Sequence, residues 1–237
     1  MPVYNQSIRH KTIDFCLRCV YNFKSRGSRG STLFGRSEGR ISAEGVTMEE
    51  NVHSRYPTFQ SFRLFGEQVF LSPLSFEDID DRVNWNTNNA PWKKLDDPNY
   101  VASTFDEIAY RLKKKQEIER NTKYIGGIYT SLEIRNKEGV HIGFINCYPY
   151  PDHCLIKESA AVGVIIPVET CRGHGWGTEA VNLYCNYLFS VGIKQLYLIT
   201  HSFNQPMVKV AAKCGFMEYR HSEQLLFVKQ NSLQQEV

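Results

Sequence analysis

Apolar residues change their spacing twice in the second half of the chain, and each change marks a boundary between elements. A β-branched run over 156–166 predicts a buried strand. A loop with glycine at every second position follows, reading Arg172-Gly-His-Gly-Trp-Gly177. Beyond the loop, apolar residues recur at helical spacing on one face, and Gly192 is placed to end that helix. The residues of this face are Ala180, Tyr184, Leu188 and Val191.

A strand and a helix follow in the same order once more. Residues 195–201 are rich in β-branched and aromatic side chains, which predicts a strand. Pro206 suits the first turn of a following helix, and Gly215 is placed as its end. Between Pro206 and Gly215, the apolar residues Met207, Val210 and Ala211 recur at helical spacing.

The pattern upstream is weaker but still divides into elements. Residues 67–71 form a first expected strand, and Ser75 is expected to cap a helix after it. A long polar loop over 86–100 follows. Ser103 is expected to cap a second helix over 104–119. That helix would carry Phe105, Ile108 and Leu112 on one side and a solvated run, Lys113 to Lys115.

Turn residues between apolar runs predict two hairpins. One turns at residues 136–139, and the other joins 216–221 to 225–229. The resulting order, a strand-rich centre and then helix, strand, helix and strand, indicates an α/β fold with a mixed sheet.

The glycine-rich loop has the chemistry of an anion site. Gly173, Gly175 and Gly177 keep side chains away from a ligand and permit φ > 0. The helix start presents unpaired N–H groups and the positive end of the helix dipole. Arg172 adds a charge and a fork of donors suited to phosphate. The loop is not a P-loop, because no Gly-Lys-Ser/Thr ends it, and its glycines lack the dinucleotide GxGxxG spacing.

Together these motifs resemble the GNAT superfamily of N-acetyltransferases. The pyrophosphate loop of that family reads Arg/Gln-x-x-Gly-x-Gly/Ala, and Arg172, Gly175 and Gly177 occupy its three defined places. The other half of the family's site is a strand, an Asn and a short helix ending in Lys-x-Gly-Phe. Asn204 and the sequence Lys213-Cys-Gly-Phe216 match it. The branch that acetylates protein N-termini, including those of ribosomal proteins, looks most similar.

The resemblance covers about residues 60–230 and implies a fold, a co-substrate and a set of contacts. The fold would be a mixed, largely antiparallel sheet with splayed central strands, flanked by helices. Acetyl-CoA, with no metal, would lie between those strands and pair with the backbone of Val164 and Ile166. An N–H of the Ile165–Ile166 region would face the thioester carbonyl oxygen. The pyrophosphate would be held by Arg172, Gly173, His174, Gly175, Trp176, Gly177 and Thr178, and the pantetheine arm by Asn204.

The proton carriers are where the chain departs from the family. Ala211 stands where a tyrosine often protonates the leaving thiolate, and Met207 stands where part of the N-terminal branch has a serine. Neither side chain can donate a proton, so a water would have to do so. For the base we expect Glu158 first and His201 second, with Glu223 as a third candidate.

Composition and charge bound the remaining expectations. The chain has 237 residues, 42% of them hydrophobic, which suits one domain and an extension. We expect a basic, mostly disordered extension over 1–57, a catalytic domain over 58–230 and a polar tail over 231–237. The extension holds nine Lys and Arg against five Asp and Glu. We interpret it as a solvated tail and not an RNA-binding arm, because its Ser-Arg-Gly part carries no interleaved aromatic residues.

Seven cysteines without a framework of spacings suggest reduced thiols and a cytoplasmic protein. No apolar run is long enough to span a membrane. Three functions stay open: acetylation of a protein N-terminal amine, acetylation of an antibiotic or polyamine, and non-catalytic binding of acyl-CoA. The expected partner is the amine acceptor, with no nucleic acid and no membrane, and the protein is expected to be a monomer or a homodimer.

Overall fold

The computed structural model describes residues 61–87, 90–96, 99–101, 104–151, 156, 158–220 and 224–231. All of them belong to one compact unit. The expected extension over 1–57 lies outside the described residues, as do Ser103, Glu223 and all of the expected tail except Asn231. The division of the chain into three parts therefore stays a prediction.

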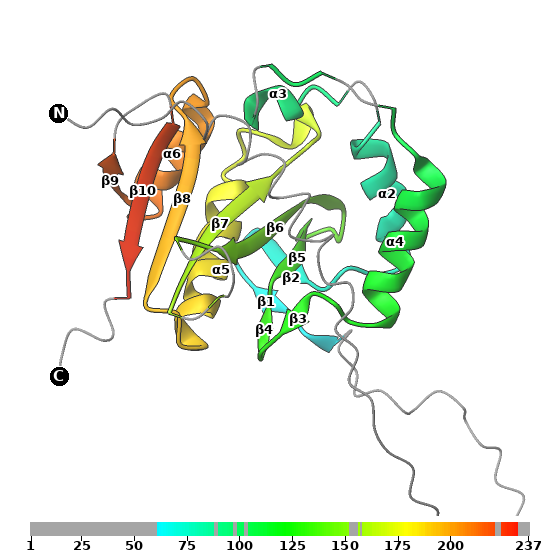
Figure 1. Ribbon diagram of the computed structural model, residues 1–237, viewed down its shortest axis with the longest axis horizontal. Helices are drawn as coiled ribbons and strands as arrows, with labels where there is room; N and C mark the ends of the chain where they lie inside the picture. Colours follow the sequence, from blue (N-terminus) through cyan, green and yellow to red (C-terminus); the bar gives the residue numbers. More distant parts are fainter. Residues whose placement is uncertain are drawn as a thin grey trace, which may run out of the picture. The chain divides into compact units, whose positions relative to one another are not determined.

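An eight-stranded sheet runs through the described part of the chain (Figure 1). In the order in which they pair, its strands are β1 (Leu64–Phe65), β2 (Val69–Ser72), β5 (Ser131–Asn136), β6 (His141–Pro149), β7 (Ser159–Ile165), β8 (Gln195–His201), β10 (Gln224–Gln230) and β9 (Met217–Arg220). Neighbouring strands are antiparallel except β7 and β8. A separate ribbon pairs β3 (Tyr124–Ile125) with β4 (Ile128–Tyr129). The mixed, largely antiparallel sheet is as predicted.

The parallel pair at the centre of the sheet is joined only at one end. Ser159 to Ala161 of β7 pair with Gln195 to Tyr197 of β8. Both strands continue four residues further, to Ile165 and His201, without pairing to each other. Two strands that start paired and then separate leave a gap between their carboxyl ends, as predicted.

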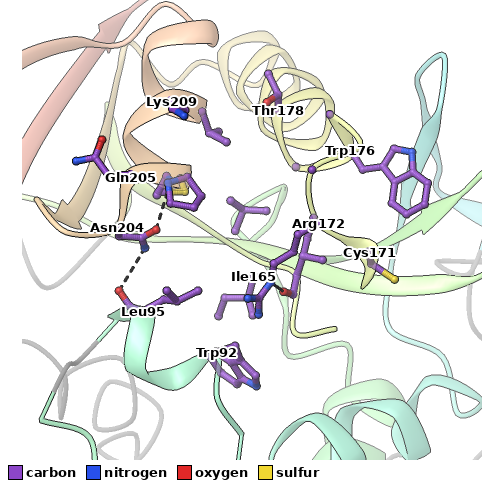
Figure 2. A pocket seen from close by; sticks show the side chains of 18 of the residues that line it. Trp92, Leu95, Ile165, Cys171, Arg172, Trp176, Thr178, Asn204, Gln205 and Lys209 are labelled. Carbon is purple, nitrogen blue, oxygen red and sulfur yellow. Dashed lines mark hydrogen bonds between the residues drawn. The ribbon is translucent and has the colours of Figure 1, made fainter. Parts of the chain in front are cut away.

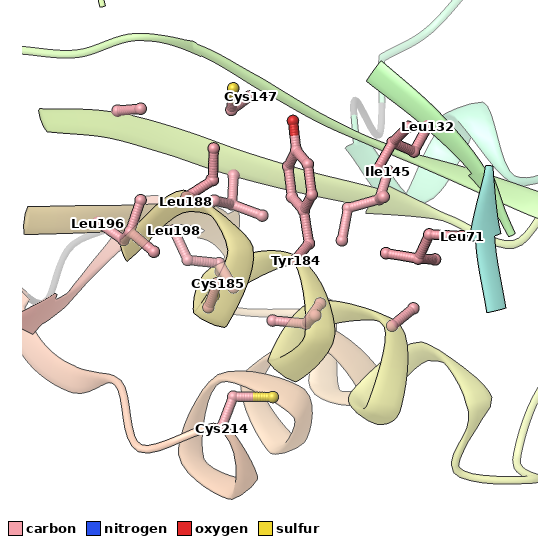
Figure 3. Packing of buried hydrophobic residues seen from close by; sticks show 14 of the residues in the cluster. Leu71, Leu132, Ile145, Cys147, Tyr184, Cys185, Leu188, Leu196, Leu198 and Cys214 are labelled. Atoms are coloured by element: carbon pink, nitrogen blue, oxygen red, sulfur yellow. The ribbon is translucent and has the colours of Figure 1, made fainter. Parts of the chain in front are cut away.

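Helices cover both faces of this sheet. They are α2 (Asp78–Trp85), α3 (Lys93–Asp96), α4 (Glu107–Glu119), α5 (Trp176–Ser190) and α6 (Gln205–Lys213), with a short 3₁₀ turn, η3 (Glu169–Cys171). The main core lies between the sheet and α5 (Figure 3). Tyr184 projects from α5 into it, and its hydroxyl donates to the Tyr129 carbonyl at 2.7 Å. Ala180 and Leu188 are fully buried as predicted, whereas Val191, the C-cap residue, is 39% exposed.

The opposite face of the sheet carries charge where it meets α2. Neighbouring residues of a strand point to opposite faces, so Leu132 packs in the core and Glu133 faces α2. His141 Nε2 lies 2.9 Å from Glu133 Oε2, and His141 Nδ1 lies 3.0 Å from Asp81 Oδ2. Three further contacts complete the group: Arg82 with Glu133, Arg135 with Asp78, and His141 Nδ1 with Asp78 Oδ1 at 3.3 Å. We call these six residues the charge cluster: Asp78, Asp81, Arg82, Glu133, Arg135 and His141.

Helix α4 corrects two predictions. Ile108 is 82% exposed and Leu112 is 56% exposed, so the apolar side of this helix faces away from the core. Its buried residues are Lys114 and Glu117, which form an ion pair of 2.6 Å. The expected solvated run Lys113 to Lys115 is therefore wrong at its middle residue. The pairing explains the burial, because a carboxylate three residues away on the same face satisfies the ammonium group.

Both upstream helices also begin later than predicted. Helix α2 starts at Asp78, whose carboxylate accepts bonds from the Ser75 N–H and hydroxyl, both at 2.8 Å. Ser75 thus contacts the helix from outside it. Helix α4 is capped by Asp106, whose side chain accepts from the Ala109 N–H. Asp and Ser are both strong N-cap residues, and the spacing of apolar residues did not decide between them.

Candidate functional site

A cavity of about 510 Å³ opens where β7 and β8 separate (Figure 2). It is lined by α3 and the residue before it, the end of β7, the glycine-rich loop, the start of α5, and α6. Ten of the predicted coenzyme residues line it: Val164, Ile165, Ile166, Arg172, Gly173, Gly175, Trp176, Gly177, Thr178 and Asn204. His174 is not among the lining residues. Its ring stacks on Trp176 with centroids 4.6 Å apart, and its Nε2 lies 3.1 Å from the Thr170 carbonyl oxygen.

The glycine-rich loop turns sharply into α5. Gly173 and Gly175 have φ values of +84° and +85°, the left-handed region that L side chains rarely adopt. Gly175 is the N-cap of α5 and provides no side-chain acceptor for the first backbone N–H groups of the helix, which belong to residues that line the cavity, Trp176 to Thr178. A Cβ at Gly177 would lie 3.3 Å from Ile166 Cδ1, so the missing side chain allows the helix start to approach the end of β7.

The Arg172 guanidinium donates two hydrogen bonds to backbone carbonyls next to its own loop. Its Nε donates to the Ile166 carbonyl at 2.8 Å, and its Nη2 donates to the Pro167 carbonyl at 2.9 Å. These bonds tie the loop to the end of β7 and fix the position of the positive charge in the cavity (Figure 2). A guanidinium has five N–H donors, so others remain for a ligand.

Both the oxygen and the nitrogen of the Asn204 side-chain amide form hydrogen bonds within the protein. Its oxygen accepts from the Met207 N–H at 3.3 Å and caps α6, and its Nδ2 donates to the Leu95 carbonyl at 3.2 Å. The side chain therefore joins α6 to α3 across the cavity (Figure 2). The predicted bond to a pantetheine arm would have to use the second amide hydrogen.

The two candidate bases lie apart from each other. Glu158 immediately precedes β7, and its side chain, 70% exposed, pairs with Lys194 at 2.7 Å. The length of β7 places this carboxylate about 20 Å from Ile165. His201 ends β8, three residues before Asn204, and its ring stacks on Phe203 with centroids 5.1 Å apart. Neither residue lines the cavity.

Several lining residues were not predicted as site residues. Trp92 and Leu95 come from the α3 region, far from the motifs in sequence. The Trp92 indole N–H donates to the Trp85 carbonyl at 2.7 Å, which fixes the ring at the edge of the cavity. Lys209 and Lys213 come from α6, where a spacing of four residues puts both on one side of the helix. That spacing was visible in the sequence.

The lining has a clear electrostatic character. Its charged side chains, among the described residues, are Arg172, Lys209 and Lys213. The positions that the family uses for an acid are apolar: Met207 lines the cavity and Ala211 is fully buried. Below the helix start, Cys214 donates its thiol hydrogen to the Thr178 carbonyl at 3.4 Å. Burial raises the pKa of this thiol to about 11, so it stays a donor at neutral pH.

The comparisons with known proteins agree with this geometry. A family model described as an acetyltransferase (GNAT) domain matches residues 68–217. Comparison with curated proteins gave no match. The chain belongs to the GNAT acetyltransferases and is an acetyl-CoA-dependent acyltransferase. The described residues contain no cluster of three or more potential metal ligands.

Solved structures share the fold at low sequence identity. A GNAT-family acetyltransferase from Bacillus anthracis is 14% identical, with a TM-score of 0.56, over 71% of this chain and 98% of its own. A ribosomal-protein-S5-alanine acetyltransferase from Vibrio fischeri is 16% identical, with a TM-score of 0.54, over 72% of this chain and 97% of its own. A spermidine N-acetyltransferase from Vibrio cholerae, in complex with CoA and spermine, is 20% identical, with a TM-score of 0.52, over 70% and 98%. In the described part of our chain, no helix is long and apolar enough to cross a membrane.

Proposed function

We propose that this protein transfers the acetyl group of acetyl-CoA to the α-amine of a polypeptide, by direct attack in a ternary complex. The observation that carries the proposal is the cavity between the separated strands, with an open helix start and three cations in its lining. Acetyl-CoA is a polyanion with an extended arm. Its phosphates fit the cationic end, and the arm fits the unpaired edge of β7.

The residues of the cavity divide the work between binding and orientation. The N–H groups of Gly177 and Thr178 would bind the diphosphate, with Arg172 beside them. The unpaired edge at Val164 to Ile166 would hold the arm as an added strand, and one N–H there would face the thioester oxygen. Acetyl-CoA supplies a thioester that an amine can attack. Holding both in one cavity provides much of the acceleration.

The attack of the amine on the thioester requires two proton transfers. The ammonium must lose a proton before its nitrogen bonds to the acyl carbon, and the departing thiolate must gain one. We assign the first transfer to His201, because its carbonyl accepts a hydrogen bond from the N–H of Asn204, which lines the cavity. Glu158 is the weaker candidate, since it pairs with Lys194 at the distant end of β7. With Met207 and Ala211 at the usual acid positions, water protonates the thiolate.

The acceptor class follows from charge. A polyamine carries several positive charges and would need carboxylates beside it, whereas the described lining of the cavity contains no Asp or Glu. An α-amine brings one charge and loses it readily. At pH 7.4 about a third of α-amines are unprotonated, compared with about one lysine-type amine in a thousand. A cavity whose described lining holds no carboxylate therefore favours a polypeptide N-terminus over a polyamine.

Calorimetry and a thiol-release assay test the proposal. The protein is titrated with acetyl-CoA and then assayed with a peptide carrying a free α-amine, the same peptide blocked at its α-amine but carrying a lysine, and spermidine. We expect acetyl-CoA binding and the fastest thiol release with the first peptide. Faster turnover of spermidine would assign the protein to polyamines. Binding without turnover of any amine would make it an acyl-CoA-binding protein.

A further inference from the structure

A carboxylate stands directly after the glycine-rich loop. Glu179 belongs to the first turn of α5, and its own N–H donates to the Gly175 carbonyl at 3.0 Å. A carboxylate in the first turn of a helix is ordinarily stabilised by the helix dipole and the open N–H groups. Here those are the groups that a diphosphate would use, so the side chain and the ligand would compete.

In the structure, the Glu179 side chain does not line the cavity and contacts another segment instead. Its carboxylate accepts the backbone N–H groups of Glu67 and Gln68, in the turn between β1 and β2. Both carboxylate oxygens lie 3.1 Å from the Gln68 nitrogen. The charge is thus satisfied by a segment more than a hundred residues earlier in the chain.

Gly66 shows that the two segments are closely fitted. A Cβ at Gly66 would overlap Glu179 Oε1 and would lie 2.9 Å from Leu183 Cδ1. Only glycine leaves space for the carboxylate at this point of the turn. The contact therefore depends on both segments: the turn has no side chain at Gly66, and the helix supplies the acceptor, Glu179.

We propose that Glu179 is a positioning residue for the acetyl-CoA site, acting through its bonds to the turn between β1 and β2. These bonds fix the first turn of α5 and keep a negative charge away from the place of the diphosphate. The inference rests on the proposed function, since it concerns the same site. It also explains how an acidic residue can follow an anion-binding loop without weakening it.

Four variants test the proposal: Glu179→Ala, Glu179→Gln, Gly66→Ala and the Gly66→Ala/Glu179→Ala double variant. Glu179→Ala should raise the Kd of CoA, measured calorimetrically, by about tenfold, the scale of one lost hydrogen bond to a charged group. Glu179→Gln keeps an acceptor oxygen and should bind CoA as well as the wild type. Gly66→Ala should displace the carboxylate and match Glu179→Ala, and the double variant should be no weaker than Glu179→Ala. The KM for acetyl-CoA should rise while kcat and the KM for the amine stay within about twofold.

Each alternative gives a different result. If Glu179 acted only as a nearby negative charge, both Glu179→Ala and Glu179→Gln would tighten CoA binding. If its role were only structural, the melting temperature would fall while the Kd of the folded variants stayed unchanged. Additive effects of Gly66→Ala and Glu179→Ala would also overturn the proposal. Glu138→Ala, in the exposed turn between β5 and β6, is the matched control. A wild type that fails to bind CoA would instead refute the proposed function.

Discussion

The cavity and the charge cluster are connected by a row of cross-strand neighbours in the sheet, but their charged side chains differ in what they face. Glu133 pairs across the strands with Phe144, and Phe144 pairs with Ile165, which lines the cavity. At the Glu133 end, Arg82, Arg135 and His141 each contact a buried or partly buried carboxylate. At the Ile165 end, the lining cations face a space that an anion could occupy. Charges paired inside the protein hold the fold together, and charges facing a cavity are available to a ligand.

The members of the charge cluster are paired with one another. His141 Nδ1 lies 3.0 Å from Asp81 Oδ2 and 3.3 Å from Asp78 Oδ1, and its Nε2 lies 2.9 Å from Glu133 Oε2. Arg82 contacts Glu133, and Arg135 contacts Asp78. These contacts offset the cost of burying the carboxylates. The cluster fixes α2 on β5 and β6, and α2 leads into the α3 region that carries Trp92 and Leu95 to the cavity.

The largest effect should come from adding a carboxylate to the cavity. Gly175→Glu puts a negative charge at the helix start, and we expect calorimetry to detect no acetyl-CoA binding. The position has space for a side chain but a φ of +85°, so some stability is lost as well. Gly139→Glu is the matched control, because Gly139 has a φ of +81° with equal space in a distant turn. It should lose similar stability and bind normally. Normal binding by a folded Gly175→Glu protein would refute the site.

The next largest effect concerns the other end of the row. Glu133→Gln keeps the shape of the side chain but leaves Arg82 and His141 without the charge of their buried partner. We expect the free energy of unfolding, measured with urea, to fall by about 3 kcal/mol. Asp81→Asn should cost less, about 1 kcal/mol at most, because Asp81 is 46% exposed. Both variants should bind acetyl-CoA normally while folded. An unchanged urea midpoint for Glu133→Gln would mean that the cluster contributes no net stability.

The glycine-rich loop and its flanking elements could be predicted because their signals are local. A β-branched run, three glycines and a helical apolar face all lie within 40 residues. The side-chain bonds could not be predicted in the same way. Asn204 contacts Leu95, 109 residues away, and Arg172 turns toward the carbonyl of Ile166, because these bonds depend on how the finished elements meet.

Helix α4 shows a different limit of sequence reasoning. Periodicity located the helix but not its buried face, because Ile108 and Leu112 suggest one side while Lys114 and Glu117 are buried on another. Hydrophobicity alone assigns lysine to solvent. A partner three residues away reverses this assignment, and only the packing of α2 against α4 reveals that both side chains are enclosed.

A smaller effect than that of Glu133→Gln is expected for Lys114, a lysine that differs from the cavity lysines in being buried. Burial, and then the charge of Arg82, lowers the pKa of Lys114 from 10.5 to about 8, despite the pairing with Glu117. Between pH 8 and pH 10.5 the unfolded chain keeps the proton that the folded protein has released. The unfolded state therefore binds more protons, and this group makes the free energy of unfolding rise with pH across that window.

Urea unfolding of the wild type and Lys114→Met at pH 7, 8, 9 and 10 measures this contribution. The difference in unfolding free energy, wild type minus variant, should increase by about 2 kcal/mol between pH 8 and pH 10, with a slope that approaches about 1.36 kcal/mol for each pH unit. The tyrosines and thiols titrate in both proteins, so their contributions to the unfolding free energy cancel when the variant is subtracted from the wild type. Lys115→Met, at the exposed neighbouring position, should give a difference that does not change with pH. A flat difference for Lys114→Met would show that Lys114 keeps its ordinary pKa and is solvated after all.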